Sequence, residues 1–177
     1  TDILLNLQRE GYPVLDLEGM AGHRGSAFGA IGLKQNSQKQ FECNLWQRLH
    51  ELKGAPYILI EAESKRIGDV ILPDFILDRK RTGKRIHVTY PFHKRIETLC
   101  RTYEPHAHKK ELRDAVSRIE KRIDTQARED LHKALAREDY PRFAAILLEY
   151  YYDPRYRHSE NLYNTTAVRV NMKHFHE

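Results

Sequence analysis

The sequence predicts an α/β protein, in which a parallel β-sheet is flanked by helices and followed by a C-terminal helical extension. Strand and helix patterns alternate between residues 12 and 103, and this order favours right-handed crossovers between parallel strands. From residue 109, apolar residues recur every three or four positions, which is the period of an amphipathic helix. We therefore expect an α/β core over 1–104, a basic helical subdomain over 105–161, and a C-terminal strand and tail over 162–177.

The first predicted elements follow from caps and apolar patterns. Residues 1–11 have the pattern of a short helix that ends at a glycine. Residues 12–18 predict a strand that leads into a glycine-rich loop over 18–32. A helix over 37–52 begins at a serine N-cap, and the apolar run 57–61 predicts a buried strand that ends in a carboxylate.

The remaining elements are predicted in the same way. Residues 62–73 are expected to form a turn, and residues 109–137 form either one long amphipathic helix or two joined helices. The other predicted elements are a short helix and turn over 74–84, a strand over 85–89, helices over 91–103 and 141–152, a loop over 153–164 and an edge strand over 166–172.

Basic charge is concentrated in one segment. The net charge of +5 divides into −3 over residues 1–78, +9 over 79–137 and −1 over 138–177. A positive surplus of this kind favours binding of a polyanion, although a solvated helix face rich in Lys and Arg has the same composition.

Cysteine and histidine spacing predicts neither a disulfide framework nor a metal site. Cys43 and Cys100 lie in amphipathic stretches without CxxC spacing, and the ten histidines are scattered. No apolar run approaches ~18 residues, which predicts no membrane contact. These features favour a reducing, cytoplasmic compartment.

The stretch "EGMAGHRGSAFGAIG" over 18–32 holds five of the nine glycines. It follows the predicted strand 12–18, and open α/β folds place ligands at the carboxyl ends of strands. Backbone N–H groups can converge there on an anion, with Asp16, His23, Arg24 and Ser26 beside it. This predicts a phosphate-binding loop, and a mobile surface loop is the alternative.

The stretch "ILIEAES" resembles a Walker B strand, in which a carboxylate at the end of an apolar strand positions magnesium or a water. Glu61 and Glu63 are the catalytic candidates, and Arg66 is expected to face the same crevice as a ligand-binding residue. The pattern GxxxxGK[ST] does not occur. Thr1 is either the N-cap of the first helix or the hydroxyl that ends such a motif.

Two basic regions are candidates for RNA binding. The polar face of 109–137 carries many cations, and "EYYYDPRYRHS" combines tyrosines with arginines in a mixture suited to stacking on unpaired bases. Packing of the aromatic residues in the core is the alternative for the second region. The candidates are Lys109, Lys110, Arg113, Arg118, Lys121, Arg122, Arg155, Tyr156 and Arg157.

Four blocks, in this order, resemble the C-terminal P-loop domain of bacterial tRNA 2-selenouridine synthases. They are "YPVLDLEGMAGHRGSAFGAIG", "SQKQFE", "ILIEAESKRIGDVILP" and "YYDPRYRHS". The resemblance implies a P-loop NTPase-like core. In that family a rhodanese-like domain with a catalytic cysteine and a Walker A loop normally precede this region. The sequence has no match to either, so we expect that further residues precede Thr1 in the natural protein and supply the first strand and phosphate loop.

The resemblance also implies a transferase. Its members convert wobble 2-thiouridine of tRNA to 2-selenouridine through an S-geranylated intermediate, with geranyl diphosphate and selenophosphate as substrates. The implied partners are tRNA and the rhodanese-like domain of the same chain, and a purine nucleotide with Mg²⁺ stays open as a further ligand. The alternatives are a P-loop small-molecule kinase, whose basic segment would be a phosphate-gripping lid, and a non-catalytic RNA-binding module.

Overall fold

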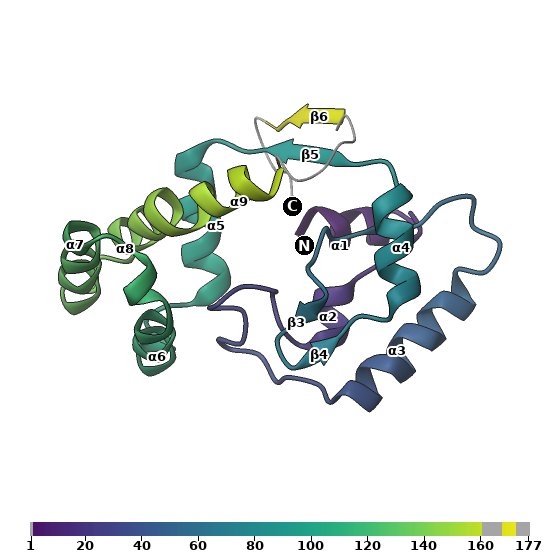
Figure 1. Cartoon of the computed structure of the whole chain (residues 1–177), viewed down its shortest axis with the longest axis horizontal. Coiled ribbons are helices and arrows are strands. Elements are labelled where there is room, and N and C mark those ends of the chain that lie inside the picture. The colour runs from purple at the N-terminus through teal and green to yellow at the C-terminus, as the bar shows by residue number, and fades with distance from the viewer. Residues whose placement is uncertain (1, 161–167, 173–177) are drawn as a thin grey trace. The chain divides into compact units, whose positions relative to one another are not determined.

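Figure 1 shows the computed structural model, which describes residues 2–160 and 168–172. The chain divides into two compact units, of which the first ends at Gly83 and the second begins at Lys84. The boundary that the sequence predicts after residue 104 falls inside the second unit. No helix in the described ranges is long and apolar enough to cross a membrane.

The first unit joins a short parallel strand pair to helices and a hairpin. Its elements are α1 (Asp2–Arg9), β1 (Val14–Leu15), α2 (Leu17–Ala21), α3 (Gln38–Glu51), β2 (Leu59–Ile60), β3 (Arg66–Ile67), β4 (Val70–Ile71) and α4 (Asp74–Thr82). Strands β1 and β2 are parallel, with Val14 opposite Leu59. This confirms that the strands predicted over 12–18 and 57–61 run in parallel.

Strand β1 is shorter than predicted because a helix begins directly after it. The Asp16 side chain accepts a hydrogen bond from the backbone N–H of Gly19 (2.8 Å) and so caps α2. Residues 17–21, which the sequence predicts as strand end and loop, are therefore helical. The predicted turn over 62–73 likewise contains the antiparallel hairpin β3–β4.

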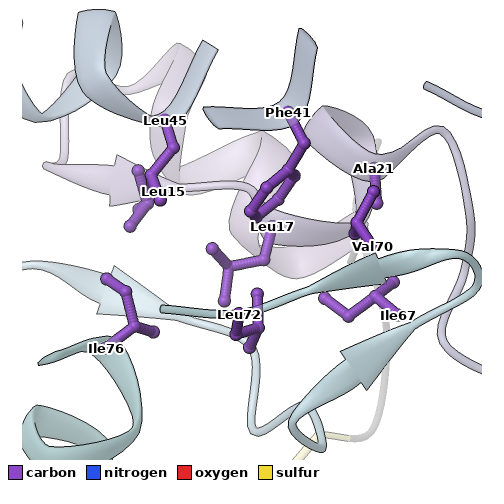
Figure 2. Packing of buried hydrophobic residues seen from close by; sticks show 9 residues of the cluster. All are labelled: Leu15, Leu17, Ala21, Phe41, Leu45, Ile67, Val70, Leu72 and Ile76. Atoms are coloured by element: carbon purple, nitrogen blue, oxygen red, sulfur yellow. The ribbon is translucent and has the colours of Figure 1, made fainter. Parts of the chain in front are cut away.

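The core of this unit forms where α3 packs on β1 and β4. In Figure 2, Phe41 and Leu45 of α3 lie with Leu15 and Leu17 opposite side chains from the hairpin and α4. All nine labelled residues are at most 5% exposed. Burial of one such large side chain contributes roughly 1.5–3 kcal/mol, so this cluster fixes the segment that follows β1.

The second unit is largely helical. Its elements are β5 (Ile86–Thr89), α5 (Phe92–Tyr103), α6 (Lys109–Ile119), the 3₁₀ turn η1 (Glu120–Arg122), α7 (Thr125–Ala136), α8 (Tyr140–Leu147), the π turn η2 (Leu148–Tyr152), α9 (Asp153–Glu160) and β6 (Val168–Asn171). Helix α8 packs against α5 and α7. Arg95 and Asp153 join α5 to α9 through hydrogen bonds of 3.0 and 2.5 Å.

Strand β5 pairs in parallel with β6, with Ile86 opposite Val168. The sequence predicts instead that strand 85–89 joins the same sheet as the strands at 12–18 and 57–61. Among the described residues the strands form three separate two-stranded sheets, because β1 and β2 pair only with each other. The chain is thus a helix-rich α/β protein with two short parallel strand pairs and one antiparallel hairpin.

Two other expectations for the second unit have definite outcomes. Residues 109–137 form two helices, because Asp124 caps α7 by accepting the N–H of Ala127 (3.0 Å). The predicted loop over 153–164 is wrong for its first part, since α9 begins at Asp153. The π turn ends at Tyr152, and Pro154 is the second residue of α9, where its missing N–H is tolerated.

Candidate active site

The carboxyl ends of β1 and β2 bring two carboxylates together. Asp16 follows β1 and Glu61 follows β2. The backbone N–H of Leu17 donates to Glu61 Oε2 at 3.0 Å, which ties the two strand ends to each other. Glu61 is only 9% exposed. The predicted Walker B-like carboxylate therefore lies at the edge of the parallel pair.

Burial, with the neighbouring Asp16 carboxyl as a smaller cause, raises the pKa of Glu61 to about 8. Glu61 Oε1 is buried and has no hydrogen-bond partner among the described residues. Protonation of Glu61 would give the buried carboxyl oxygen a hydrogen-bond partner, because the resulting O–H can donate to Asp16. At neutral pH the Glu61 carboxyl is therefore largely uncharged.

Glu63 forms a second acidic pair, with Glu18 of α2. Burial raises the pKa of Glu63 to about 7, and the charge of Glu18 acts in the same direction, whereas the Lys80 ammonium opposes both. Lys80 also donates a hydrogen bond to the backbone carbonyl oxygen of Glu63. A carboxyl in this state gains and loses a proton near neutral pH, as a general acid or base must.

Glycines in and near the loop after α2 allow the backbone to approach two polar side chains closely. Gly25 has φ +65°, and a Cβ there would overlap the Glu63 carboxylate. Gly29 and Gly68 lie against the ring of His23. That ring is buried, and its Nδ1 accepts the N–H of Gly25 at 3.1 Å. The glycine-rich loop therefore brings Glu63 and His23 next to its backbone.

The other predicted ligand residues have structural contacts in this loop. Arg24 Nη1 donates to the Ile31 carbonyl at 2.8 Å, and Ser26 Oγ accepts the N–H of Phe28 at 3.2 Å. Arg66 is exposed on β3, and Thr1 lies outside the described residues. Contact of these residues with a phosphate stays a prediction. Nowhere in 2–160 or 168–172 do three His, Cys, Asp or Glu side chains form a group that could hold a metal ion.

The predicted RNA-binding residues lie in the second unit and differ in their surroundings. Lys109 forms a 2.5 Å ion pair with Glu138. The Arg155 guanidinium lies 4.2 Å from the centre of the Tyr151 ring, and Tyr156 stacks on Tyr152 at 6.3 Å. The other six predicted cations, all exposed, are Lys110, Arg113, Arg118, Lys121, Arg122 and Arg157.

A family model described as "tRNA 2-selenouridine synthase AAA domain" matches residues 1–174. The chain belongs to this family. This confirms the resemblance that the four sequence blocks indicate.

Relatives of the tRNA 2-selenouridine synthase family cover most of the chain. A tRNA 2-selenouridine synthase of Chromohalobacter salexigens is 34% identical over 172 residues, covering 81% of this chain and 46% of the relative. Those of Nitrosomonas europaea and Sulfurovum sp. are each 30% identical, covering 77% and 80% of this chain and 36% and 47% of the relatives. The chain thus spans less than half the length of these relatives. No solved structure matches it.

Two residues of this tRNA 2-selenouridine synthase domain escape sequence-based prediction. Glu18 interacts with Glu63 because α2 begins directly after Asp16. Prediction of a helix start at Leu17 would have been needed to find this contact. Lys80 reaches Glu63 from α4, although the two residues are 17 positions apart in the chain. No local pattern signals that contact.

Proposed function

We propose that this chain is the part of a tRNA 2-selenouridine synthase that binds the phosphorylated substrates and the tRNA. The complete enzyme would convert wobble 2-thiouridine to 2-selenouridine through an S-geranylated intermediate, using geranyl diphosphate and selenophosphate. The rhodanese-like domain would come from the remainder of the same chain. Family membership supports the general role, and the arrangement of the site supports the assignment of the ligand region to the ends of β1 and β2.

The observation that carries this proposal is that two carboxyls beside a glycine-rich loop, the buried Glu61 and the half-buried Glu63, both have raised pKa values. The two acidic pairs, Asp16 with Glu61 and Glu18 with Glu63, would repel a diphosphate or selenophosphate if every carboxyl were charged. Because the pKa of Glu61 is raised to about 8 and that of Glu63 to about 7, much of this negative charge is absent at neutral pH. An anionic substrate can then approach Arg24 and Arg66, and Glu63 can take up or release the proton that the reaction moves.

The test uses the full-length natural synthase that contains this domain, with tRNA carrying 2-thiouridine. After incubation with geranyl diphosphate and then selenophosphate, the tRNA is digested and the nucleosides are identified by mass. We expect a geranylated nucleoside after the first step and 2-selenouridine after the second. Glu63→Gln should lower the rate by about a hundredfold, as expected for loss of an acid–base group.

Glu51→Gln is the matched control, because this glutamate is exposed at the end of α3 and bonded to Arg48 of the same helix. The control should keep the wild-type rate. In the wild type the rate should change with an inflection near pH 7, and Glu63→Gln should lose that inflection. Absence of both modified nucleosides with wild-type enzyme would reject the proposed function, and an unchanged pH profile in Glu63→Gln would reject the role of Glu63.

A second prediction concerns the tRNA backbone. Charge reversal of Lys121 and Arg122, which are exposed in the turn between α6 and α7, should weaken tRNA binding at least tenfold at about 0.1 M salt, whatever the tRNA sequence. The slope of log affinity against log salt should become shallower. Reversal of Arg9 and Lys34 changes the charge equally at exposed positions of the first unit and should have a smaller effect. Equal effects would reject the turn as a contact.

A further inference from the structure

Helix α3 presents a cationic and aromatic stripe on the side opposite its packed face. Phe41 and Leu45 point into the core. The exposed residues Lys39, Cys43, Trp46, His50 and Lys53 follow one another at steps of four and three, so they lie along one line of the helix and its C-terminal end. We call these five residues the α3 stripe.

Trp46 is the centre of the α3 stripe. It is 70% exposed, although large aromatic side chains are usually well buried. The His50 ring stacks on it at 5.6 Å with an interplanar angle of 10°. This contact leaves most of the indole surface accessible while it restricts the orientation of the ring. The result is a preformed aromatic platform on a rigid helix.

Cations lie on both sides of this platform. Lys39 and Lys53 are each seven residues from Trp46, a distance of roughly 10 Å along the helix axis. Neither lysine forms an ion pair within the described part of the chain, and both are exposed. Of the nearby carboxylates, Glu51 is paired with the Arg48 guanidinium, whereas Glu42 accepts from the neutral amide of Gln38 and keeps its charge. The α3 stripe itself contains two lysines and no carboxylate, so it has positive charge on both sides of a flat aromatic surface.

This combination suits an unpaired nucleobase better than a protein partner. A protein interface has a contiguous apolar centre, whereas Trp46 is the one large apolar side chain of α3 that is strongly exposed. Single-stranded nucleic acid needs an aromatic face for a base and cations for the flanking phosphates. The spacing of Lys39, Trp46 and Lys53 provides both.

We propose that the α3 stripe binds single-stranded RNA, with one unpaired base stacked on Trp46 and phosphates near Lys39 and Lys53. This rests on the proposed function and extends it, since it assigns to the first unit a contact with an unpaired segment of the tRNA. It is separate from the basic turn of the second unit, which would contact the backbone.

The test uses the chain's own fluorescence, because Trp46 is its only tryptophan. The 177-residue chain is titrated with an oligouridine of about eight nucleotides, which is within the usual site size for single strands. We expect saturable quenching that weakens as salt is raised, and no quenching by an RNA duplex of the same length. Addition of tRNA should displace a labelled oligouridine, because both would occupy the same stripe.

Variants separate stacking from general charge. Trp46→Ala should weaken binding of a labelled oligouridine on the order of tenfold, and Trp46→Phe should keep most of the affinity. Phe75→Ala is the matched control, because Phe75 is half exposed on α4 of the same unit and lies outside the stripe. Lys39→Glu with Lys53→Glu should weaken binding and reduce its salt dependence.

The outcomes distinguish this inference from the proposed function. If tRNA is modified normally by the full-length enzyme but Trp46→Ala binds oligouridine like the wild type, the stacking site is rejected and the function stands. If quenching occurs but no modified nucleoside forms, the function is rejected and the stripe stands. Self-association that Trp46→Ala abolishes, without quenching by RNA, would make the stripe a protein contact and overturn the inference.

Discussion

Replacing Gly22 by alanine is expected to lower the free energy of unfolding by about 2–4 kcal/mol. Gly22 ends α2 with φ +63°, a backbone conformation that residues with a Cβ rarely adopt. A Cβ there would also overlap the backbone carbonyl oxygen of Lys34. Because this obstacle is backbone and cannot rotate away, the loop must shift, and in that loop Gly25 lies against the Glu63 carboxylate. Urea unfolding followed by circular dichroism measures the effect.

Gly11→Ala is the control for backbone strain alone. Gly11 has φ +88°, and nothing lies within 4 Å of the position its Cβ would take. This variant should cost about 1 kcal/mol. The difference between the two variants then measures the close approach of Lys34. If both variants lose the same free energy of unfolding, the carbonyl of Lys34 does not add to the cost of a side chain at Gly22, and this explanation is rejected.

Local patterns allowed much of the first unit to be predicted. The helix over 37–52 was expected from a serine cap, and α3 begins there because Ser37 Oγ accepts the N–H of Gln40 at 3.2 Å. Such a cap depends on residues three positions apart, which the sequence displays directly. The parallel pairing of β1 with β2 was expected from an intervening helix of sufficient length. The cap is predicted because its cause is close in sequence, and the pairing is predicted because the helix between the two strands shows in the sequence.

The remainder depends on contacts between distant segments. The sequence does not show that Asp16 ends β1 by capping α2, because an aspartate after an apolar pair is equally compatible with a longer strand. The pairing of β5 with β6 joins residues about eighty positions apart, and the sequence of neither strand indicates which other strand it pairs with. In the site, the sequence predicts Glu61 and Glu63 as catalytic candidates, because Glu61 ends an apolar strand and Glu63 follows it two residues later. Their protonation depends on burial and on Asp16 and Glu18, which only the folded chain provides.

Glu61→Gln is expected to change how stability depends on pH. The pKa of Glu61 is raised from 4.5 to about 8 in the folded protein, so between these values the folded state keeps a proton that the unfolded state has lost. The free energy of unfolding therefore falls as pH rises from about 4.5 to 8, and this carboxyl accounts for about 2–4 kcal/mol of the fall. Glutamine keeps the shape and cannot ionise, and its amide can donate to Asp16 while its carbonyl accepts from Leu17.

The variant should therefore match the wild type near pH 4.5 and be more stable than it at pH 8.5. Urea unfolding across this range measures the two curves. Glu10→Gln, at an exposed position after α1, controls for removal of a charge without burial and should leave the wild-type curve unchanged. Glu63 titrates in the overlapping window up to about pH 7, so part of the slope should persist in Glu61→Gln below that pH. A variant that is less stable than the wild type at pH 8.5 would mean that the Glu61 carboxylate, rather than its neutral acid, holds the ends of β1 and β2 together.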